Sequence, residues 1–241
     1  MVRPIKIVPA ILTEDPRALE KMVRQAETFC DYVQFDIMDG RFVPSQSIKC
    51  EHIASLNTRL GWEVHLMVEQ PEDYVNDFST AGASKIVFHY EATPAPEKTI
   101  GLVRAKGIEV GIALNPETPV SAVLPLVSKI DSVLCLTVNP GFYGSPFLPE
   151  VMEKVIELRR IHPETEIGVD GGIKEANIAQ IARSGVDNIY VGSAILLQPQ
   201  PAASYRHLSA LAREKQIPMS IVKKARQELE INPEKSNPYF S

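Results

Sequence analysis

Eight short apolar runs recur along the chain, spaced roughly 20 to 30 residues apart. Most are continuous stretches of Val, Ile and Leu without alternation. That pattern is typical of strands buried on both faces in a parallel sheet. The runs predicted as strands are 6–12, 32–37, 61–68, 85–89, 107–114, 132–138, 166–170 and 188–191.

Amphipathic patterns separate these runs and predict helices. The expected helical segments are 17–29, 47–60, 71–81, 97–106, 120–127, 150–161, 176–184 and 202–215. Regular alternation of strand and helix indicates parallel βα units, and eight such units in 241 residues favour a closed (β/α)8 TIM barrel over a doubly wound sheet. We assign 1–216 to the barrel and 217–241 to a C-terminal extension, with one more helix at 217–230 followed by a tail.

Composition narrows the function classes. An apolar content of 44%, a charged content of 23% and a net charge of −5 describe an ordinary globular protein without the basic face that nucleic-acid binding needs. No apolar run approaches the roughly 18 residues that would span a membrane. The cysteines Cys30, Cys50 and Cys135 are odd in number and far apart. They predict reduced thiols in a cytoplasmic protein.

The most informative stretch is 31–44, DYVQFDIMDGRFVP, a β-prone run that breaks at Asp39 and Gly40. Alternation along a strand puts Gln34, Asp36 and Met38 on one face. A carboxylate among buried apolar neighbours is costly unless something pairs with it. Asp36 is therefore either a chemical group or an acid bonded to backbone amides at a strand end.

Other polar side chains also fall at the predicted carboxyl ends of strands, the rim where TIM barrels carry their active sites. They are Asp36, His65, His89, Asn115, Asn139 and Asp170. Two carboxylates and an imidazole suit a divalent metal, an acid/base pair, or both. His65 could instead be a satisfied core histidine, and His89 either lines the mouth or is merely packed.

Glycine-rich segments follow the last three strands. Glycine allows a ligand close to backbone N–H groups, and the loops after strands 7 and 8 are the usual phosphate site of this architecture. A phosphate site is favoured over glycines that only make tight turns. The residues expected to bind phosphate are Gly141, Phe142, Tyr143, Gly144, Gly171, Gly172, Gly192 and Ser193.

These motifs resemble the ribulose-phosphate 3-epimerase family over about residues 6–197. The matching segments are 31–44, 64–69 (VHLMVE), 114–119 (LNPETP), 137–144 (TVNPGFYG), 169–172 (VDGG) and 191–194 (VGSA). The resemblance implies a barrel that interconverts ribulose 5-phosphate and xylulose 5-phosphate in the pentose phosphate pathway. Related epimerases of phosphorylated hexuloses share the motifs, so another ketose phosphate stays open.

The resemblance also implies residue roles. Asp36 and Asp170 would be the proton carriers on opposite faces of the sugar. Asp36, His65 and Asp170 match three of the family's four ligands to a divalent metal, which would be Zn, Fe, Mn or Mg. His65 would also contact substrate, and Met38 and Met67 would floor the site.

Four positions depart from the family pattern. Gln34 replaces the remaining histidine ligand, and its amide is a weaker ligand than imidazole for zinc or iron, so the expected outcomes are weaker metal binding, a harder ion, or no metal. Ala10 replaces a substrate-contacting serine, Tyr143 replaces a glycine, and Arg41 replaces a histidine. A phosphosugar-binding barrel with weakened or lost catalysis is therefore a second hypothesis. An isomerase or decarboxylase of another phosphate-binding barrel family is a third, and a homo-oligomer is left open.

Overall fold

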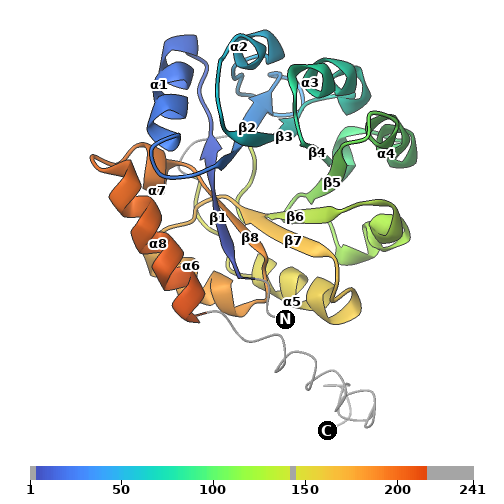
Figure 1. Ribbon diagram of the computed structural model, residues 1–241. Helices are drawn as coiled ribbons and strands as arrows, with labels where there is room; N and C mark the ends of the chain where they lie inside the picture. Colours follow the sequence, from blue (N-terminus) through green and yellow to red (C-terminus); the bar gives the residue numbers. More distant parts are fainter. Residues whose placement is uncertain (1–3, 142–144, 216–241) are drawn as a thin grey trace, which may run out of the picture.

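Eight parallel strands close into a barrel in the computed structural model, which describes residues 4–141 and 145–215 (Figure 1). Each strand pairs with the next, and the first pairs with the last. The strands are β1 (Lys6–Ile11), β2 (Tyr32–Met38), β3 (Gly61–Met67), β4 (Lys85–His89), β5 (Glu109–Leu114), β6 (Ser132–Leu136), β7 (Glu166–Asp170) and β8 (Asn188–Val191). The predicted TIM barrel is confirmed.

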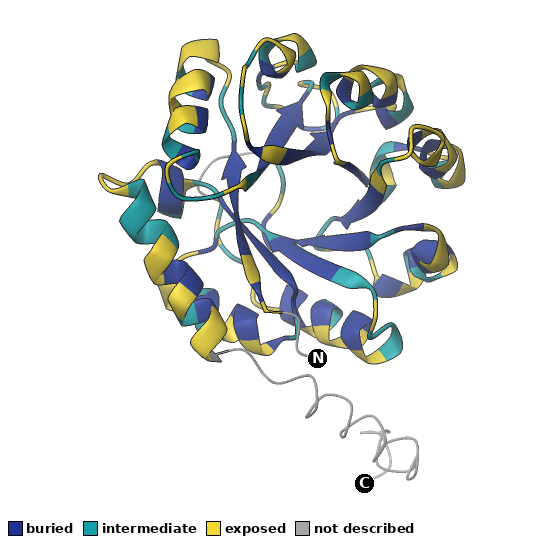
Figure 2. Ribbon diagram, in the orientation of Figure 1, coloured by how far each residue is buried: buried dark blue, intermediate teal, exposed yellow. Residues whose placement is uncertain are grey.

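Helices surround the strands and bury their inner faces against them, while their outer faces are exposed (Figure 2). The α-helices are α1 (Pro16–Ala26), α2 (Cys50–Ala54), α3 (Val75–Ala81), α4 (Pro96–Ala105), α5 (Val151–Ile161), α6 (Glu175–Arg183), α7 (Ser193–Leu196) and α8 (Pro201–Lys215). Short 3₁₀ helices are η1 (Pro71–Asp73), η2 (Tyr90–Ala92), η3 (Val120–Ala122) and η4 (Leu124–Lys129).

Helix α1 shows how local sequence sets these elements. Asp15 caps it by accepting a 2.9 Å hydrogen bond from the Arg17 N–H, and Pro16 occupies the first turn, where its missing N–H costs nothing. Leu19, Val23 and other residues at helical spacing then face the strands.

Two expected helices differ most from the structure. The helix expected at 47–60 forms only over Cys50–Ala54, because Ser47 and Ile48 hydrogen-bond to Met38 and Thr13 in neighbouring segments. The helix expected at 120–127 is replaced by η3 and η4, since Pro125 cannot donate in the interior of an α-helix. The extension expected at 217–241 lies outside the described residues.

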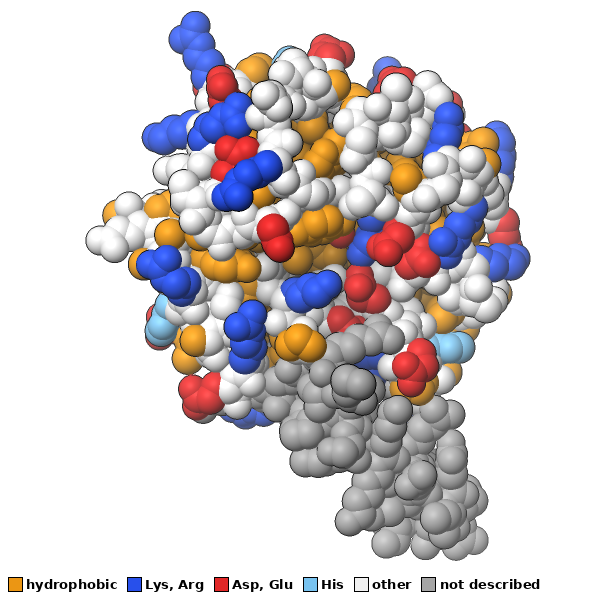
Figure 3. Space-filling view, in the orientation of Figure 1, with side chains coloured by type: hydrophobic (Ala, Val, Ile, Leu, Met, Phe, Trp, Pro, Cys, Tyr) orange, Lys and Arg blue, Asp and Glu red, His pale blue; other side chains and the backbone are white. Residues whose placement is uncertain are grey.

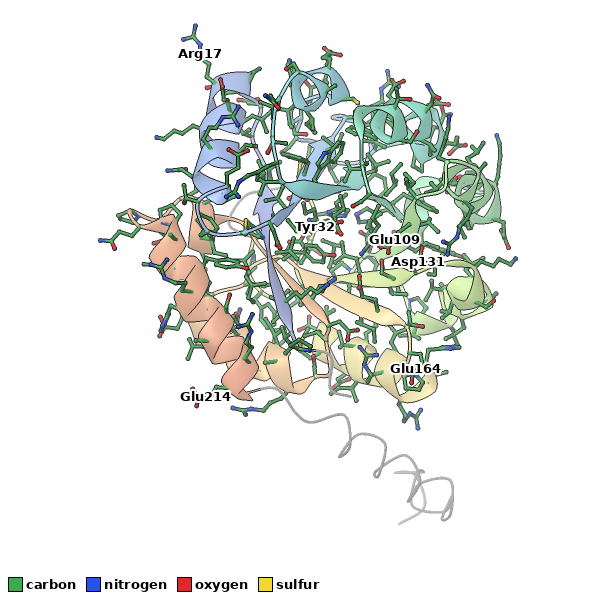
Figure 4. The ribbon with its side chains drawn as sticks, viewed as in Figure 1. Arg17, Tyr32, Glu109, Asp131, Glu164 and Glu214 are labelled. Atoms are coloured by element: carbon green, nitrogen blue, oxygen red, sulfur yellow. The ribbon has the colours of Figure 1, made fainter. Side chains whose placement is uncertain are left out.

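The barrel interior is layered from one end to the other. At its N-terminal end, the buried Lys85 ammonium lies 3.3 Å from Glu63, 3.7 Å from Glu109 and 2.6 Å from Glu166. Tyr32 and Glu109, labelled in Figure 4, come from this end of β2 and β5. An apolar layer lies above it and includes Val8, Val87, Leu134 and Tyr190. The polar rim described next therefore lies on an apolar floor.

The outer surface carries both signs of charge, interspersed over the helices in the view of Figure 3. Within residues 4–141 and 145–215, no helix has the length and apolar character needed to cross a membrane.

Candidate active site

A cavity of about 130 Å³ opens at the carboxyl ends of the strands, where TIM barrels place their active sites. Asp36, His65 and Asp170 all line it, so the structure brings together the three residues that the sequence predicted for chemistry. Met38 and Met67 line it too and pack against Val43. Ala10, the departure on β1, is also in its wall.

The pairing of β2 with β3 brings the first two residues of the site together. Asp36 on β2 is the direct pairing partner of His65 on β3, so both side chains leave their strands toward the barrel interior at the same level. His65 Nδ1 lies 3.2 Å from Asp36 Oδ1 and 3.7 Å from Asp170 Oδ2. The imidazole therefore faces both carboxylates.

Gln34 is two residues before Asp36 on the same face of β2 and is fully buried. Its side-chain Nε2 donates 2.8 Å hydrogen bonds to Asp36 Oδ1 and to Asp170 Oδ2. Gln34 Oε1 is buried and has no hydrogen-bond partner among the described residues. The amide thus bridges the two acids while its own oxygen stays unpaired, which is costly in a buried position.

Burial and proximity shift the proton affinities of this cluster. Burial, together with the charge of Asp36, raises the pKa of Asp170 to about 7. Burial alone would lower the pKa of His65, but the hydrogen bond and charge of Asp36 outweigh it and raise that pKa. A carboxyl that titrates near neutrality beside a second acid is the arrangement expected of an acid–base pair.

The same atoms fit a divalent cation. One ligand atom each from Asp36, His65 and Asp170 lies within 4.8 Å of the others. Turning the Gln34 amide over would put Oε1 where Nε2 now lies, 2.8 Å from both carboxylate oxygens. Three or four N and O donors then converge, a set that Zn²⁺, Fe²⁺ or Mn²⁺ accepts.

His89 at the end of β4 is packed rather than lining the mouth. It is fully buried, and its Nε2 lies 3.0 Å from His65 Nε2. Its other nitrogen, Nδ1, lies 3.3 Å from Glu91 Oε2. Asn115, also expected at the rim, turns its backbone N–H to Glu91 Oε1 at 2.9 Å. His89 and Asn115 are therefore not among the residues that line the cavity.

Two hydroxyls hold the strand ends that carry the acids, and sequence reasoning missed both. Ser47 Oγ donates to the Asp36 carbonyl at 2.9 Å. On the other side, Thr137 Oγ1 contacts the carbonyls of Asp170 and Gly171 at 2.9 and 2.5 Å. Nothing in the spacing of Ser47 or Thr137 marks them, because the contacts join segments distant in the chain.

The glycine segments meet at this cavity as expected. Gly141, Gly171, Gly172, Gly192 and Ser193 line it, whereas Phe142, Tyr143 and Gly144 lie outside the described residues. Gly171 has φ +111°, and an added Cβ would lie 2.4 Å from Val138 Cγ2, so the turn itself also requires glycine there. These loops therefore make tight turns and present glycine backbone to the cavity.

Lys174 lines the same wall, just beyond Gly172, and was not singled out from the sequence. A signal was available, since Lys174 is the first cation after the seventh strand. The loop before it is fixed, because Asn177 Nδ2 donates to the Gly172 carbonyl at 2.9 Å.

The fold and these side chains define a (β/α)8 barrel with two carboxylates and an imidazole at its C-terminal rim. Comparison of sequences then specifies the type of barrel. The chain belongs to the ribulose-phosphate 3-epimerase family, whose model matches residues 6–196.

Relatives named ribulose-phosphate 3-epimerase match over most of their length. The Schizosaccharomyces pombe protein is 38% identical over 202 residues, covering 81% of this chain and 89% of the relative. Ribulose-phosphate 3-epimerase 2 of Cupriavidus necator is 39% identical over 224 residues, covering 88% and 92%. The cytoplasmic isoform of Oryza sativa is 40% identical over 206 residues, covering 81% and 89%.

Solved structures with a similar fold are more distant in sequence. A 3-hexulose-6-phosphate synthase has a TM-score of 0.67 at 17% identity, covering 86% of this chain and 99% of its own. The 3-hexulose-6-phosphate synthase of Salmonella typhimurium has a TM-score of 0.68 at 14% identity, covering 88% and 100%. At these identities the similarity shows the barrel alone.

Proposed function

We propose that the protein interconverts ribulose 5-phosphate and xylulose 5-phosphate, with Asp36 and Asp170 as the two proton carriers. Family membership makes it an isomerase of the epimerase type. The observation that carries the residue assignment is the pair of acids from β2 and β7, joined through one Gln34 amide at the cavity. The proposal of another isomerase or decarboxylase family loses its support, because the sequence relatives are epimerases.

The reaction requires two proton transfers at C3, the carbon beside the ketone. One carboxylate removes the C3 proton from one face and leaves an enediolate, and the opposite carboxyl returns a proton to the other face. The pair must therefore hold one proton between its members. A pKa of about 7 for Asp170 lets that side chain keep the proton near neutrality while Asp36 acts as base, and the roles reverse in the other direction.

Charge develops on oxygen as the enediolate forms, and the site offers donors to meet it. His65 Nδ1 lies between the acids, 3.2 Å from one and 3.7 Å from the other, in a buried position where a hydrogen bond is strong. A divalent metal held by Asp36, His65 and Asp170, with Gln34 Oε1 as fourth ligand, would supply Lewis-acid stabilisation of the same charge.

We assign the phosphate of the substrate to the cavity wall formed by the loops after β7 and β8. Gly171, Gly172, Gly192 and Ser193 present close backbone there, and Lys174 adds a positive charge at the same wall. Gly141 reaches the cavity from the loop after β6. Met38 and Met67, two residues beyond Asp36 and His65 toward the rim, offer the sugar an apolar surface that would hold it without competing for its hydroxyls.

Hydrogen exchange tests the proposal directly. The purified protein is incubated with ribulose 5-phosphate in heavy water, with and without added Zn²⁺, Mn²⁺ or Mg²⁺ and after treatment with a chelator. We expect deuterium at C3 of both epimers. A hexulose 6-phosphate, run in parallel, tests the alternative substrate.

The replacement of the family histidine by Gln34 is the observation that favours the second hypothesis, a phosphosugar-binding barrel with weakened catalysis. Binding of ribulose 5-phosphate without deuterium incorporation under any metal condition would support that hypothesis and contradict the epimerase.

All three cysteines are free, which supports a cytoplasmic location. Assembly into a homo-oligomer stays a prediction.

A further inference from the structure

Behind His65 runs a chain of polar side chains that the proposed proton transfers do not use, made of two buried histidines and a carboxylate whose side chain is 21% exposed. It leads from His65 to His89 and then to Glu91. The His65 and His89 rings are inclined by only 21°, with centroids 5.1 Å apart and nearest nitrogens 3.0 Å apart. This is an edge-to-edge arrangement in which one ring's N–H points at the lone pair of the other, rather than a face-to-face stack.

The hydrogen bonds of this chain can run in one direction only. Glu91 is ionised, because hydrogen bonds from His89 and Thr118 outweigh its burial and hold its pKa below the usual value. A carboxylate only accepts, so the proton between Glu91 and His89 lies on His89 Nδ1. The His89 ring is fully buried and its Nε2 faces the His65 ring, so a second proton would make it a buried cation beside another imidazole. With its one proton on Nδ1, the Nε2 of His89 is bare.

The consequence falls on His65. Two bare nitrogens facing each other at 3.0 Å would repel, so His65 Nε2 must carry a proton and donate it to His89 Nε2. The other nitrogen of this ring, His65 Nδ1, faces Asp36 and Asp170. It is then the only ring nitrogen of His65 that can gain or lose a proton.

We propose that Glu91 is a positioning residue that acts through His89 to fix the tautomer of His65. The inference rests on the proposed function of the site. The fixed tautomer leaves His65 Nδ1 as the group that either donates toward the carboxylates or offers a lone pair to a metal. Carboxylates behind a ligand histidine commonly orient the ring in this way.

Other hydrogen bonds hold Glu91 in place. The direction of the hydrogen bonds from His65 to His89 and from His89 to Glu91 is fixed for that reason. Its Oε1 accepts from the backbone N–H of Asn115 at 2.9 Å and from the Thr118 hydroxyl. Only Oε2 remains for His89. Phe42 packs on the His89 ring with centroids 4.8 Å apart and limits its rotation.

The tautomers are measured by nitrogen NMR on the full-length wild-type protein, labelled with ¹⁵N-histidine and freed of metal. Signals of the five histidines are assigned with single substitutions. We expect His89 to be protonated at Nδ1 and bare at Nε2, and His65 to be protonated at Nε2. A bare His65 Nε2 or a protonated His89 Nε2 would overturn the proposal.

Glu91→Gln is the matching perturbation. Its amide oxygen would keep the contacts to Asn115 and Thr118, so the NH₂ group would face His89 and force the proton onto the far nitrogen. We expect the His89 tautomer to switch, His65 Nε2 to become bare, and Zn²⁺ affinity by calorimetry to fall roughly 10- to 100-fold. Thr118→Val, which loses a contact to the same carboxylate but leaves Oε2 in place, is the control and should keep the wild-type tautomers.

The outcomes separate this inference from the proposed function. Unchanged tautomers and unchanged Zn²⁺ affinity in a folded Glu91→Gln protein would show that Glu91 merely packs. If Glu91→Gln does not fold, the wild-type spectrum still decides. Expected tautomers in a protein that incorporates no deuterium would leave the inference standing and remove the epimerase.

Discussion

The side-chain amide of Gln34 donates a 2.8 Å hydrogen bond to Oδ2 of Asp170, a residue 136 positions later in the chain. The same NH₂ group reaches Asp36 at 2.8 Å. A neutral donor thus holds together two acids that would otherwise repel, at the position where the family resemblance implies a histidine. The amide thus supplies, between the two carboxylates, part of the attraction that a bound cation would supply.

Gln34→His should strengthen metal binding. The imidazole removes the bridging NH₂ group and supplies a better ligand for zinc than an amide oxygen. We expect the dissociation constant for Zn²⁺, measured by competition with a chelator, to fall on the order of tenfold or more. Gln34→Met, which removes the bridge without adding a strong zinc ligand, is the control. Equal affinity in wild type and Gln34→His would mean that position 34 does not reach the ion.

Asp36→Asn and Asp170→Asn should each abolish interconversion of the two epimers, which needs both acids. An amide cannot accept or return the C3 proton, and general acid–base groups of this kind contribute about 10²- to 10⁴-fold. Conversion of ribulose 5-phosphate to xylulose 5-phosphate measures the loss, and calorimetry with ribulose 5-phosphate checks that binding persists. Asp15→Asn, at the distant N-cap of α1, should retain the wild-type rate. Full interconversion in either rim variant would remove its assigned role.

The convergence of Asp36, His65 and Asp170 could be predicted because the strand pattern alone fixes it. Alternation sends side chains inward, and the carboxyl ends of parallel strands share one rim. The role of His89 could not be predicted, since the same position at a strand end allows either a lining or a packed side chain. Its orientation depends on Glu91, whose own anchoring comes from the segment at Asn115.

Other misses have the same origin in contacts between distant segments. Ser47 leaves the predicted helix because its hydroxyl and N–H bond to the end of β2. Helical periodicity does not register such a competing partner. Pro125, by contrast, was a local signal that should have shortened the helix expected at 120–127.

Thr137→Val should impair turnover more than folding. It removes the hydroxyl that contacts the carbonyls of Asp170 and Gly171, while the Thr137 N–H keeps its own 2.7 Å bond to Asp170. We expect kcat to fall several-fold and stability to drop by about 1 kcal/mol, typical of one lost hydrogen bond. Thr137→Ser keeps the hydroxyl and should restore kcat. A shift in thermal unfolding with unchanged kcat would contradict the positioning role.

Lys174→Met should weaken substrate binding without slowing the proton transfers. The substitution removes the cation assigned to the phosphate and keeps much of the side-chain length. Charge-assisted hydrogen bonds contribute about 1.5–3 kcal/mol, so KM should rise roughly tenfold or more while kcat stays near the wild-type value. Lys174→Arg should recover most of the affinity. A loss confined to kcat would place Lys174 at the reacting carbons instead.

The stability of the metal-free protein should decline as pH rises toward neutrality because of Asp170. Its pKa is raised from an ordinary 3.8 to about 7 in the folded protein, mainly by burial. Between these values the folded state holds a proton that the unfolded state has released, so each pH unit costs up to about 1.4 kcal/mol. Below about pH 4 both states are protonated, and above about pH 7 both are ionised, so the contribution levels off at each end. Denaturant unfolding in chelator at about pH 5 to 8 measures this contribution as the unfolding free energy of wild type minus that of Asp170→Asn. This difference should become more negative as pH rises, and a difference that becomes more positive would contradict the raised pKa.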